Sequence, residues 1–260
     1  MKTSYTIIGE HLVSIQSFSG RFTSWLKEQF QINESPSPSV DLTLQIHEGY
    51  GSPFVDYQVK ISNTAKHIIY RRADYLLKVN LDYRQAEIHA YDDLALKHAL
   101  NNVYSAFIVY HRWGLLVHSS CVDHQGKAFL FAGPSGAGKS TVARLSAPRP
   151  LLSDEATLVK ITESGITVFD SPFRSELKTP HFSPSCPLSG VYLLHQSLDV
   201  KTTLLSRSDA LLNIMDKIFY WSHDSSETMK LFHLCKLLVE KVPVYRMDFQ
   251  KNNSFWELIS

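Results

Sequence analysis

Cysteine is scarce in this sequence, and long apolar runs are absent. The 260 residues include only three cysteines, Cys121, Cys186 and Cys235. This odd, scattered set predicts reduced thiols rather than a disulfide framework, and no pair has zinc-finger spacing. No stretch approaches the ~20 apolar residues of a membrane helix. The first residues, MKTSYTIIGEHLV, show no signal-peptide pattern, so we expect a cytoplasmic location.

An excess of charge of either sign is also absent. The chain has 26 Lys and Arg residues against 25 Asp and Glu residues, and its formal net charge is +1. Electrostatic capture of nucleic acid or of an anionic membrane surface usually needs a clear basic excess, so we expect neither partner. Hydrophobic residues are plentiful at 44%, and aromatic residues make up 12%. This composition supports a sizeable folded core and argues against disorder.

Residues 1–112 are predicted to form a mixed α/β region. Prolines and serines at 33–39 mark a loop between a helix over Arg21–Phe30 and a strand over Asp41–His47. The patterns further on predict strands over Phe54–Ile61, Tyr75–Leu81 and Ala86–Tyr91, the last two as a hairpin, and a helix over Leu94–His111. The composition of this region names no activity. A sheet edge within residues 41–91 could bind an extended peptide by strand addition, so substrate recognition is a hypothesis for this region.

Residues 113–260 show a different pattern of apolar and turn residues and are expected to form a second α/β domain. The expected strands are Gly114–Val122, Lys127–Phe131, Leu151–Leu152, Leu158–Ile161, Ile166–Phe169, Gly190–His195 and Val242–Phe249. One helix is expected to begin near Lys139, and others cover Ser208–Tyr220, Ser225–Lys241 and Ser254–Leu258. Asp224 and Glu227 have the spacing of a capping box at the start of the helix over 225–241.

Between a strand and a helix of this second domain, residues 133–141 read GPSGAGKST. They fit the Walker A pattern G-x-x-x-x-G-K-[ST] without a gap. Glycines let backbone N–H groups approach phosphate oxygens closely, and the helix N-terminus favours the same anion. The motif therefore predicts a phosphate-binding loop for a nucleoside triphosphate. The residues of this loop are Gly133, Pro134, Ser135, Gly136, Ala137, Gly138, Lys139, Ser140 and Thr141.

Two loop residues and the acids that follow are candidates for the chemistry. Lys139 is expected to place its ammonium on the β- and γ-phosphates, and Ser140 offers a hydroxyl to Mg²⁺. Asp154 and Glu155 follow the next strand, and strand carboxyl ends face the ligand crevice of an open α/β sheet. Asp154 is therefore expected to meet the γ-phosphate or its metal, and Glu155 is a candidate metal ligand. An exposed acidic turn is the competing interpretation of this pair.

A second charged cluster lies in FDSPFRSELK and contains Asp170, Arg174 and Glu176. Glu176 is a candidate metal ligand, and Arg174 is a candidate for neutralising the transferred phosphate. Surface salt pairing explains the cluster equally well. His118 lies in LLVHSSCV, on the strand before the loop. A lone histidine on a strand is more often a core residue than a catalytic one, so the residue alone assigns no role.

Read in order, His118, GPSGAGKS and LLSDE resemble the HPr kinase/phosphorylase family. They are more closely similar to the smaller HPr-kinase-related proteins of bacterial peptide-modification clusters, including the lasso-peptide serine kinases. The resemblance covers residues 113–197 and implies a P-loop kinase domain of the type shared with phosphoenolpyruvate carboxykinases. It implies Asp154 as the general base, His118 on the acceptor side, Ser140 as a metal ligand and Glu176 as a further metal-binding acid.

The sequence also departs from the parent family. Glu155 stands where that family has a second Asp, and Thr141 stands where it usually has Glu. The signatures for handling HPr are not recognisable in the C-terminal part, and the first hundred residues do not look like the family's regulatory domain. Kinase activity is therefore expected from the resemblance, whereas HPr as the substrate and the reverse phosphorolysis are not.

These observations predict an ATP- and Mg²⁺-dependent kinase that transfers the γ-phosphoryl group to a serine hydroxyl. The expected partner is a peptide or small protein, with a lasso-type or other ribosomal peptide precursor as the favoured substrate. Asp154, His118 and Lys139 are the expected catalytic residues. The alternatives are a small-metabolite kinase, an HPr-type protein kinase, and a non-catalytic nucleotide-dependent peptide-binding module. The sequence leaves open the choice of ATP or GTP and the oligomeric state, a homo-oligomer included.

Overall fold

The structure is a computed structural model, and it describes residues 3–35, 39–175 and 185–259. The chain is a mixed α/β protein, as the sequence predicts. It divides into two compact units. The first unit contains Met1–His111 and Tyr220–Thr228, and the second contains Arg112–Phe219 and Met229–Ser260. The helices of the described part of the chain are too short or too polar to cross a membrane.

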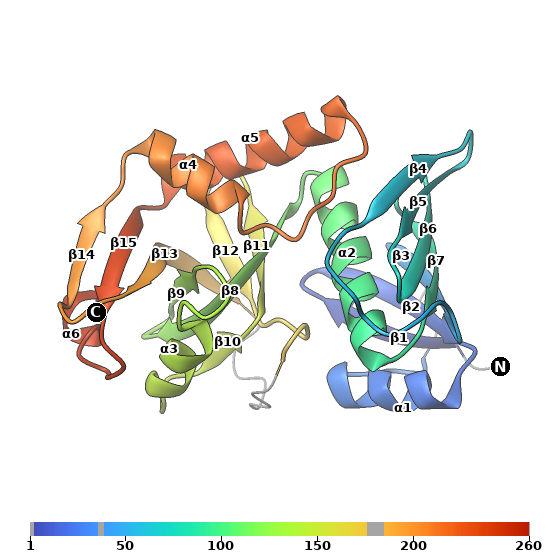
Figure 1. Cartoon of the computed structure of the whole chain (residues 1–260), viewed down its shortest axis with the longest axis horizontal. Coiled ribbons are helices and arrows are strands. Elements are labelled where there is room, and N and C mark those ends of the chain that lie inside the picture. Colours follow the sequence, from blue (N-terminus) through green and yellow to red (C-terminus); the bar gives the residue numbers. More distant parts are fainter. Residues whose placement is uncertain (1–2, 36–38, 176–184, 260) are drawn as a thin grey trace. The chain divides into compact units, whose positions relative to one another are not determined.

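The first unit contains a seven-stranded sheet in the order β1-β2-β3-β7-β6-β5-β4 (Figure 1). Its strands are β1 (Thr3–Ile8), β2 (His11–Ser17), β3 (Leu42–Glu48), β4 (Lys60–Asn63), β5 (His67–Arg71), β6 (Tyr75–Asn80) and β7 (Gln85–Ala90). β3 is parallel to both of its neighbours, β2 and β7. The other pairs are antiparallel. Along each strand, alternate residues point to opposite faces of this sheet.

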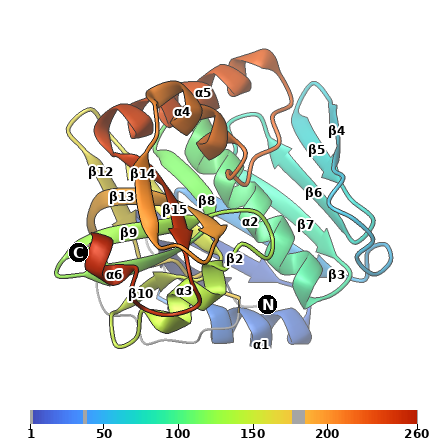
Figure 2. The same cartoon turned by 60° about the vertical axis from the view of Figure 1, so that its left-hand side comes forward.

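Two helices cover this sheet, α1 (Gly20–Gln29) and α2 (Asp93–Tyr110). Each begins at a side-chain cap: Ser19 accepts from the Phe22 N–H, and Asp92 accepts from the Ala95 N–H. α1 packs against β2 and α2, and α2 crosses β6 and β7 (Figure 2). The sheet face toward α2 is identified by Tyr75, whose hydroxyl accepts a hydrogen bond from Asn102 of α2 at 3.1 Å.

In the first unit, local patterns predicted most elements correctly. The helices over 21–30 and 94–111, the strand over 41–47 and the hairpin over 75–91 are confirmed within a few residues. The strand over Phe54–Ile61 is wrong, since only Lys60–Asn63 form a strand. The apolar side chains of this segment pack on each other, with Phe54 and Tyr57 rings 4.9 Å apart, and on Arg72. β1, β2 and β5 were not predicted.

The segment Tyr220–Thr228 belongs to the first unit through a buried polar network. The Tyr83 hydroxyl lies 3.3 Å from His223 Nδ1, and that nitrogen lies 2.8 Å from Glu227 Oε2. The predicted capping box is half formed, since the Glu227 N–H donates to Asp224 Oδ1 at 2.8 Å. The Glu227 carboxylate instead accepts from the Tyr220 hydroxyl at 2.6 Å.

The second unit is organised around the strand order β10-β8-β11-β12-β13-β15-β14, with β9 paired to both β8 and β13. Five strands, β8, β11, β12, β13 and β9, therefore form a closed ring of hydrogen-bonded pairs. β13 lies between β9 and β15 and is parallel to both. The strands are β8 (Gly114–His124), β9 (Lys127–Ala132), β10 (Leu151–Ser153), β11 (Ala156–Ile161), β12 (Ile166–Phe169), β13 (Ser185–Gln196), β14 (Lys201–Leu204) and β15 (Val244–Phe249). The helices are α3 (Lys139–Leu145), α4 (Arg207–Met215), α5 (Ser225–Lys241), which starts in the first unit, and α6 (Trp256–Ile259).

Most of the predicted strands of this unit are confirmed, but one helix ends earlier than predicted. The helix over Ser208–Tyr220 stops at Met215. The residues that follow pair with β8 instead: the His118 N–H donates to the Lys217 carbonyl at 2.6 Å, and the Phe219 N–H donates to the Leu116 carbonyl at 3.0 Å. This pairing removes the backbone groups that a longer helix would use. β14 was not predicted.

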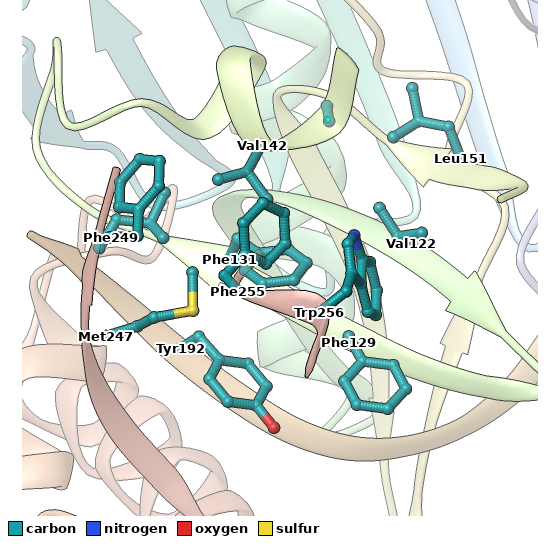
Figure 3. Close-up of a cluster of buried hydrophobic side chains, with 12 residues drawn as sticks. Val122, Phe129, Phe131, Val142, Leu151, Tyr192, Met247, Phe249, Phe255 and Trp256 are labelled. Atoms are coloured by element: carbon teal, nitrogen blue, oxygen red, sulfur yellow. The ribbon is translucent and has the colours of Figure 1, made fainter. Parts of the chain in front are cut away.

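An aromatic core lies behind the glycine-rich loop (Figure 3). Phe131 of β9 packs edge-on against Phe255 and Trp256, with ring centroids 5.9 Å apart in each pair. Val142 of α3 points into this cluster. Phe249, the last residue of β15, closes one side and is 1% exposed. The core therefore fixes α3 and the ends of two parallel strands around one loop.

Candidate functional site

The loop of residues 133–138 joins β9 to α3 and has the conformation that its glycines allow. Gly136 has φ +79° and Gly138 has φ +110°, values that side chains disfavour. A Cβ on Gly138 would lie 2.6 Å from the Phe249 ring, and one on Gly133 would lie 2.7 Å from the Ala137 Cβ. Glycine is therefore required at 138 both by the backbone angle and by the close approach of the ring.

Lys139 is buried at the start of α3 and is 9% exposed. Its ammonium donates to the carbonyl oxygens of Gly133 at 2.9 Å and Pro134 at 3.1 Å. Its own carbonyl accepts from the Ser120 hydroxyl at 3.1 Å, which ties the loop to β8. The loop thus holds a buried cation by its own carbonyl oxygens, at the position where the motif places the phosphate-contacting lysine.

A pocket of about 330 Å³ opens beside this loop, and we call it the loop pocket. It is lined by His118, Ser135, Gly136, Gly138, Lys139, Ser140, Thr141, Glu155, Ser175, Gln196 and Lys251. The structure therefore brings together the loop, the predicted His118 and the predicted Glu155. Asp154 does not line this pocket and lies behind Ser175.

Cationic side chains gather at the loop pocket. Burial lowers the pKa of Lys139, the nearby Lys217 ammonium lowers it further, and Glu155 acts in the opposite direction. Burial, followed by the charges of Lys139 and Lys217, lowers the pKa of His118 to about 4. The His118 imidazole is therefore neutral at pH 7. A buried lysine whose pKa is lowered by burial and by a neighbouring cation is stabilised in its charged form by an anionic ligand.

Asp154 directly follows β10, as predicted, but β10 pairs antiparallel with β8 and does not extend a parallel sheet. The Asp154 carboxylate is 3% exposed. Its Oδ1 accepts the Ser175 N–H at 2.9 Å, and its Oδ2 accepts the Ser175 hydroxyl at 2.9 Å. Because Ser175 also lines the loop pocket, the hydrogen-bonded pair of Ser175 and Asp154 lies at the wall of this pocket.

The second charged cluster is arranged differently from the prediction. Arg174 Nη2 donates to Asp170 Oδ1 at 2.5 Å and to the Leu151 carbonyl at 2.9 Å, and Arg174 Nε donates to the Ser171 carbonyl at 3.1 Å. Its side chain is 9% exposed. The guanidinium therefore fixes the chain after β12 and is engaged away from the loop pocket. Glu176, the predicted metal ligand, lies outside the described residues.

Three pocket residues were missed from the sequence, namely Ser175, Gln196 and Lys251, and so was the nearby Lys217. Gln196 ends β13, and its Nε2 donates to the Gly136 carbonyl at 2.8 Å. β13 and β15 run parallel to β9, so their carboxyl ends meet the loop that follows β9. Gln196 and Lys251 both lie at or just after the carboxyl ends of these strands. The rule that such strand ends face the ligand site could therefore have found both residues from the sequence.

The fold and site together define a mixed α/β protein with a glycine-rich loop beside a cationic pocket. Residues 84–260 match the family described as SynChlorMet cassette protein ScmC, and the chain belongs to this family. No curated protein matches the sequence. The matched residues include the whole loop pocket and begin before β7, so β1 to β6 precede them. The family description names a cassette and no reaction.

Proposed function

We propose that this protein is an ATP- and Mg²⁺-dependent kinase that phosphorylates a serine hydroxyl of a peptide or small protein. The second unit would then be a P-loop kinase domain of the HPr kinase/phosphoenolpyruvate carboxykinase type. The observation that carries the proposal is the hydrogen bond from the Ser175 hydroxyl to Asp154 Oδ2, at the wall of a pocket lined by Lys139. It pairs a serine hydroxyl with a carboxylate beside a phosphate-binding motif.

The loop pocket suits a triphosphate in both shape and charge. Gly136 and Gly138 have positive φ angles, a loop conformation that lets backbone N–H groups turn toward an anion. Lys139 and Lys251 line the pocket with positive charge, and an anion bound there would offset the effect of the nearby Lys217 ammonium on Lys139. His118, neutral at pH 7, can donate or accept a hydrogen bond at the pocket without adding charge.

The residues present also fit a magnesium ion. Ser140 and Glu155 both line the loop pocket and supply the hydroxyl and carboxylate oxygens that Mg²⁺ prefers. The ion would neutralise charge on the β- and γ-phosphates. Glu155 replaces the second aspartate of the families that this chain resembles, and its longer side chain still places a carboxylate at the pocket.

In the proposed reaction, the acceptor serine takes the place of the Ser175 hydroxyl on Asp154. The acceptor oxygen forms a bond to the γ-phosphorus, and the bond from that phosphorus to the β,γ-bridging oxygen breaks. The acceptor proton passes to Asp154 Oδ2, and ADP leaves. Asp154 would thus act as the general base and Lys139 as the cation that offsets the charge of the phosphates.

The acceptor is proposed to be a peptide rather than a free metabolite. The support is the resemblance of residues 113–197 to kinases of peptide-modification clusters, together with the described sheet of the first unit, whose edges are β1 and β4. A strand edge can bind an extended peptide through backbone hydrogen bonds. A small metabolite has no peptide backbone and cannot pair with a strand edge in this way.

The test is phosphoryl transfer from [γ-³²P]ATP with Mg²⁺ to serine-containing peptides, to free serine and to small alcohols. We expect transfer to a peptide. Asp154→Asn should reduce the rate by roughly 10²- to 10⁴-fold, the usual contribution of a general base, while ATP binding measured by calorimetry is retained. The substitution keeps the shape of the side chain and an oxygen for the Ser175 N–H.

Two control variants complete this test. Asp199→Asn changes an exposed carboxylate of the same unit and should leave transfer unchanged. Ser175→Ala removes the chain's own hydroxyl from Asp154, and peptide phosphorylation should persist at an equal or higher rate. Transfer by Asp154→Asn at the wild-type rate would exclude Asp154 as the base. ATP binding without transfer to any acceptor would favour a non-catalytic binding module.

A further inference from the structure

Two histidines and a glutamate gather on one face of the seven-stranded sheet in the first unit. His47 of β3 and His89 of β7 are direct partners in the parallel register. Glu87 precedes His89 by two residues and therefore lies on the same face of β7. This is the face opposite α2, because the alternate residues Ala86, Ile88 and Ala90 are buried. We call these three residues the His-Glu-His trio.

The ligand atoms of the trio converge. One imidazole nitrogen of each histidine and one Glu87 carboxylate oxygen all lie within 4.8 Å of one another. His89 Nε2 is already 2.9 Å from Glu87 Oε1. Ligands around a tetrahedral ion with bonds of ~2.0 Å lie about 3.3 Å apart, so the longest separation must shorten by at most about 1.5 Å. Rotation of side chains that are about one-third exposed can supply that change.

Neighbouring rings orient the histidines. The His47 ring is stacked between Phe18, at a centroid distance of 4.2 Å, and His89, at 4.6 Å. The middle ring is therefore fixed by both neighbours, and His89, at the end of the stack, is the ring that can turn toward a shared ion. Lys78 lies 3.6 Å from Glu87 Oε2, which leaves Oε1 as the oxygen on the histidine side.

The geometry points to a divalent transition-metal site of the zinc class formed by His47, Glu87 and His89. Two imidazoles and one carboxylate are a ligand set that suits Zn²⁺, whereas Mg²⁺ and Ca²⁺ prefer oxygen ligands alone. Two ligands spaced i and i+2 on one strand, with a third on the neighbouring strand, hold their atoms on one face by register. The site is separate from the loop pocket and from the magnesium proposed there, and it is independent of the kinase reaction.

The trio would leave the ion with open coordination positions. Three protein ligands occupy three positions of a tetrahedral zinc ion, and the fourth takes water or a group from a ligand. The ion would replace the hydrogen bond between His89 and Glu87, with each of these atoms bonding the metal. The first unit would thereby gain a point of attachment for a carboxylate, imidazole or thiolate of a bound partner.

Calorimetric titration of the full-length, untagged protein with Zn²⁺ tests this site, without nucleotide and with excess Mg²⁺ present. We expect one equivalent of Zn²⁺ to bind, and Co²⁺ to give the visible absorption of a low-symmetry site. His47→Ala and His89→Ala should each weaken binding at least about tenfold. The three cysteines are buried, so exposed thiols do not compete for the ion.

Two variants distinguish this site from other zinc-binding groups. His67→Ala removes a histidine of β5 in the same sheet and should leave binding unchanged. Ser140→Ala changes the loop pocket and should also leave it unchanged. Absence of Zn²⁺ binding by the folded wild-type protein would overturn the proposal. So would wild-type affinity in His47→Ala and His89→Ala, since the ion would then be held elsewhere.

Discussion

The loop pocket of the second unit and the His-Glu-His trio of the first unit have opposite electrostatic character. The loop pocket is lined by the cations Lys139 and Lys251, and the nearby Lys217 ammonium lowers the pKa of Lys139. The trio gathers a carboxylate and two imidazoles around one point. The first arrangement favours a polyanion, and the second favours a metal cation.

The two sites also differ in what holds them in place. The loop pocket depends on backbone: positive φ angles at the glycines, a ring in contact with Gly138, and carbonyl oxygens around Lys139. The trio depends on strand register, which places His47 opposite His89. A substitution in one site should therefore leave ligand binding at the other site unaffected.

Among the variants that compare the two units, the largest effect is expected from Lys139→Met. This variant removes the buried cation while keeping an unbranched side chain of similar length, so phosphoryl transfer should fall by about 10²- to 10³-fold. Zn²⁺ binding by the first unit should be unchanged. Initial rates with [γ-³²P]ATP and zinc calorimetry on the same preparation measure both.

Lys236→Met is the matched control for this prediction. Lys236 lies on α5, and its side chain is 55% exposed. Its loss should alter neither transfer nor zinc binding. Wild-type transfer by Lys139→Met would show that the loop does not bind the phosphates. A loss of zinc binding in the same variant would show that the two sites are coupled.

Two glycines, one in each unit, provide a smaller effect on stability. A Cβ on Gly51 would lie 2.0 Å from the Ala73 carbonyl oxygen, at φ +74°. Backbone cannot easily give way, so Gly51→Ala should lower the free energy of unfolding by on the order of 3 kcal/mol. Gly138 also has a positive φ (+110°), but a Cβ there meets the edge of the Phe249 ring rather than backbone, and the ring can shift, so the loss should be smaller, about 1–2 kcal/mol.

Urea unfolding followed by circular dichroism measures this difference. Gly20→Ala, at the first residue of α1, places a Cβ in open space and should be close to neutral. Equal losses for Gly138→Ala and Gly51→Ala would show that the Phe249 ring is as rigid as backbone. The loop would then be fixed by its core more strongly than its conformation indicates.

Local sequence patterns predicted the elements that depend on local interactions. The hairpin of β6 and β7 and the strand, loop and helix around Lys139 follow from turn residues and a contiguous motif. The predicted strand over residues 54–61 was wrong because its apolar residues pack against Arg72 and one another. The overlong helix after residue 208 was wrong because distant β8 takes its backbone groups.

The residues of the two proposed sites also divide into those that local sequence predicts and those that only the fold brings together. The loop residues and the position of Asp154 after β10 were predicted, since both are read along the chain. Gln196 and Lys217 come from segments more than 50 residues beyond the loop and require the strand order. The trio requires the register of β3 with β7, strands that are about 40 residues apart in the sequence. Register between distant strands is not visible in the sequence of either strand alone.

The smallest expected effect is on the pKa values of two histidines, one in each unit. The pKa of His118 is lowered to about 4 by burial and then by Lys139 and Lys217. The pKa of His98 is also lowered to about 4, by burial and then by Arg72 and Lys97, while Asp74 and Asp92 act in the opposite direction. Both bind a proton less readily than in the unfolded chain, where the ordinary value is 6.5. Each therefore makes stability fall as pH decreases from about 6.5 toward 4.

Inorganic tripolyphosphate should separate the two histidines. Bound in the loop pocket, it would offset the charges of Lys139 and Lys217 and raise the pKa of His118, so that protonation begins at a higher pH. His98 should titrate as before, because its cationic neighbours belong to the first unit. NMR titration of the imidazole Cε1–H signals, assigned with His118→Gln and His98→Gln, measures both pKa values. Sodium chloride at matched ionic strength is the control, and a parallel shift of both histidines would mean that the anion acts by general screening rather than by binding at the loop.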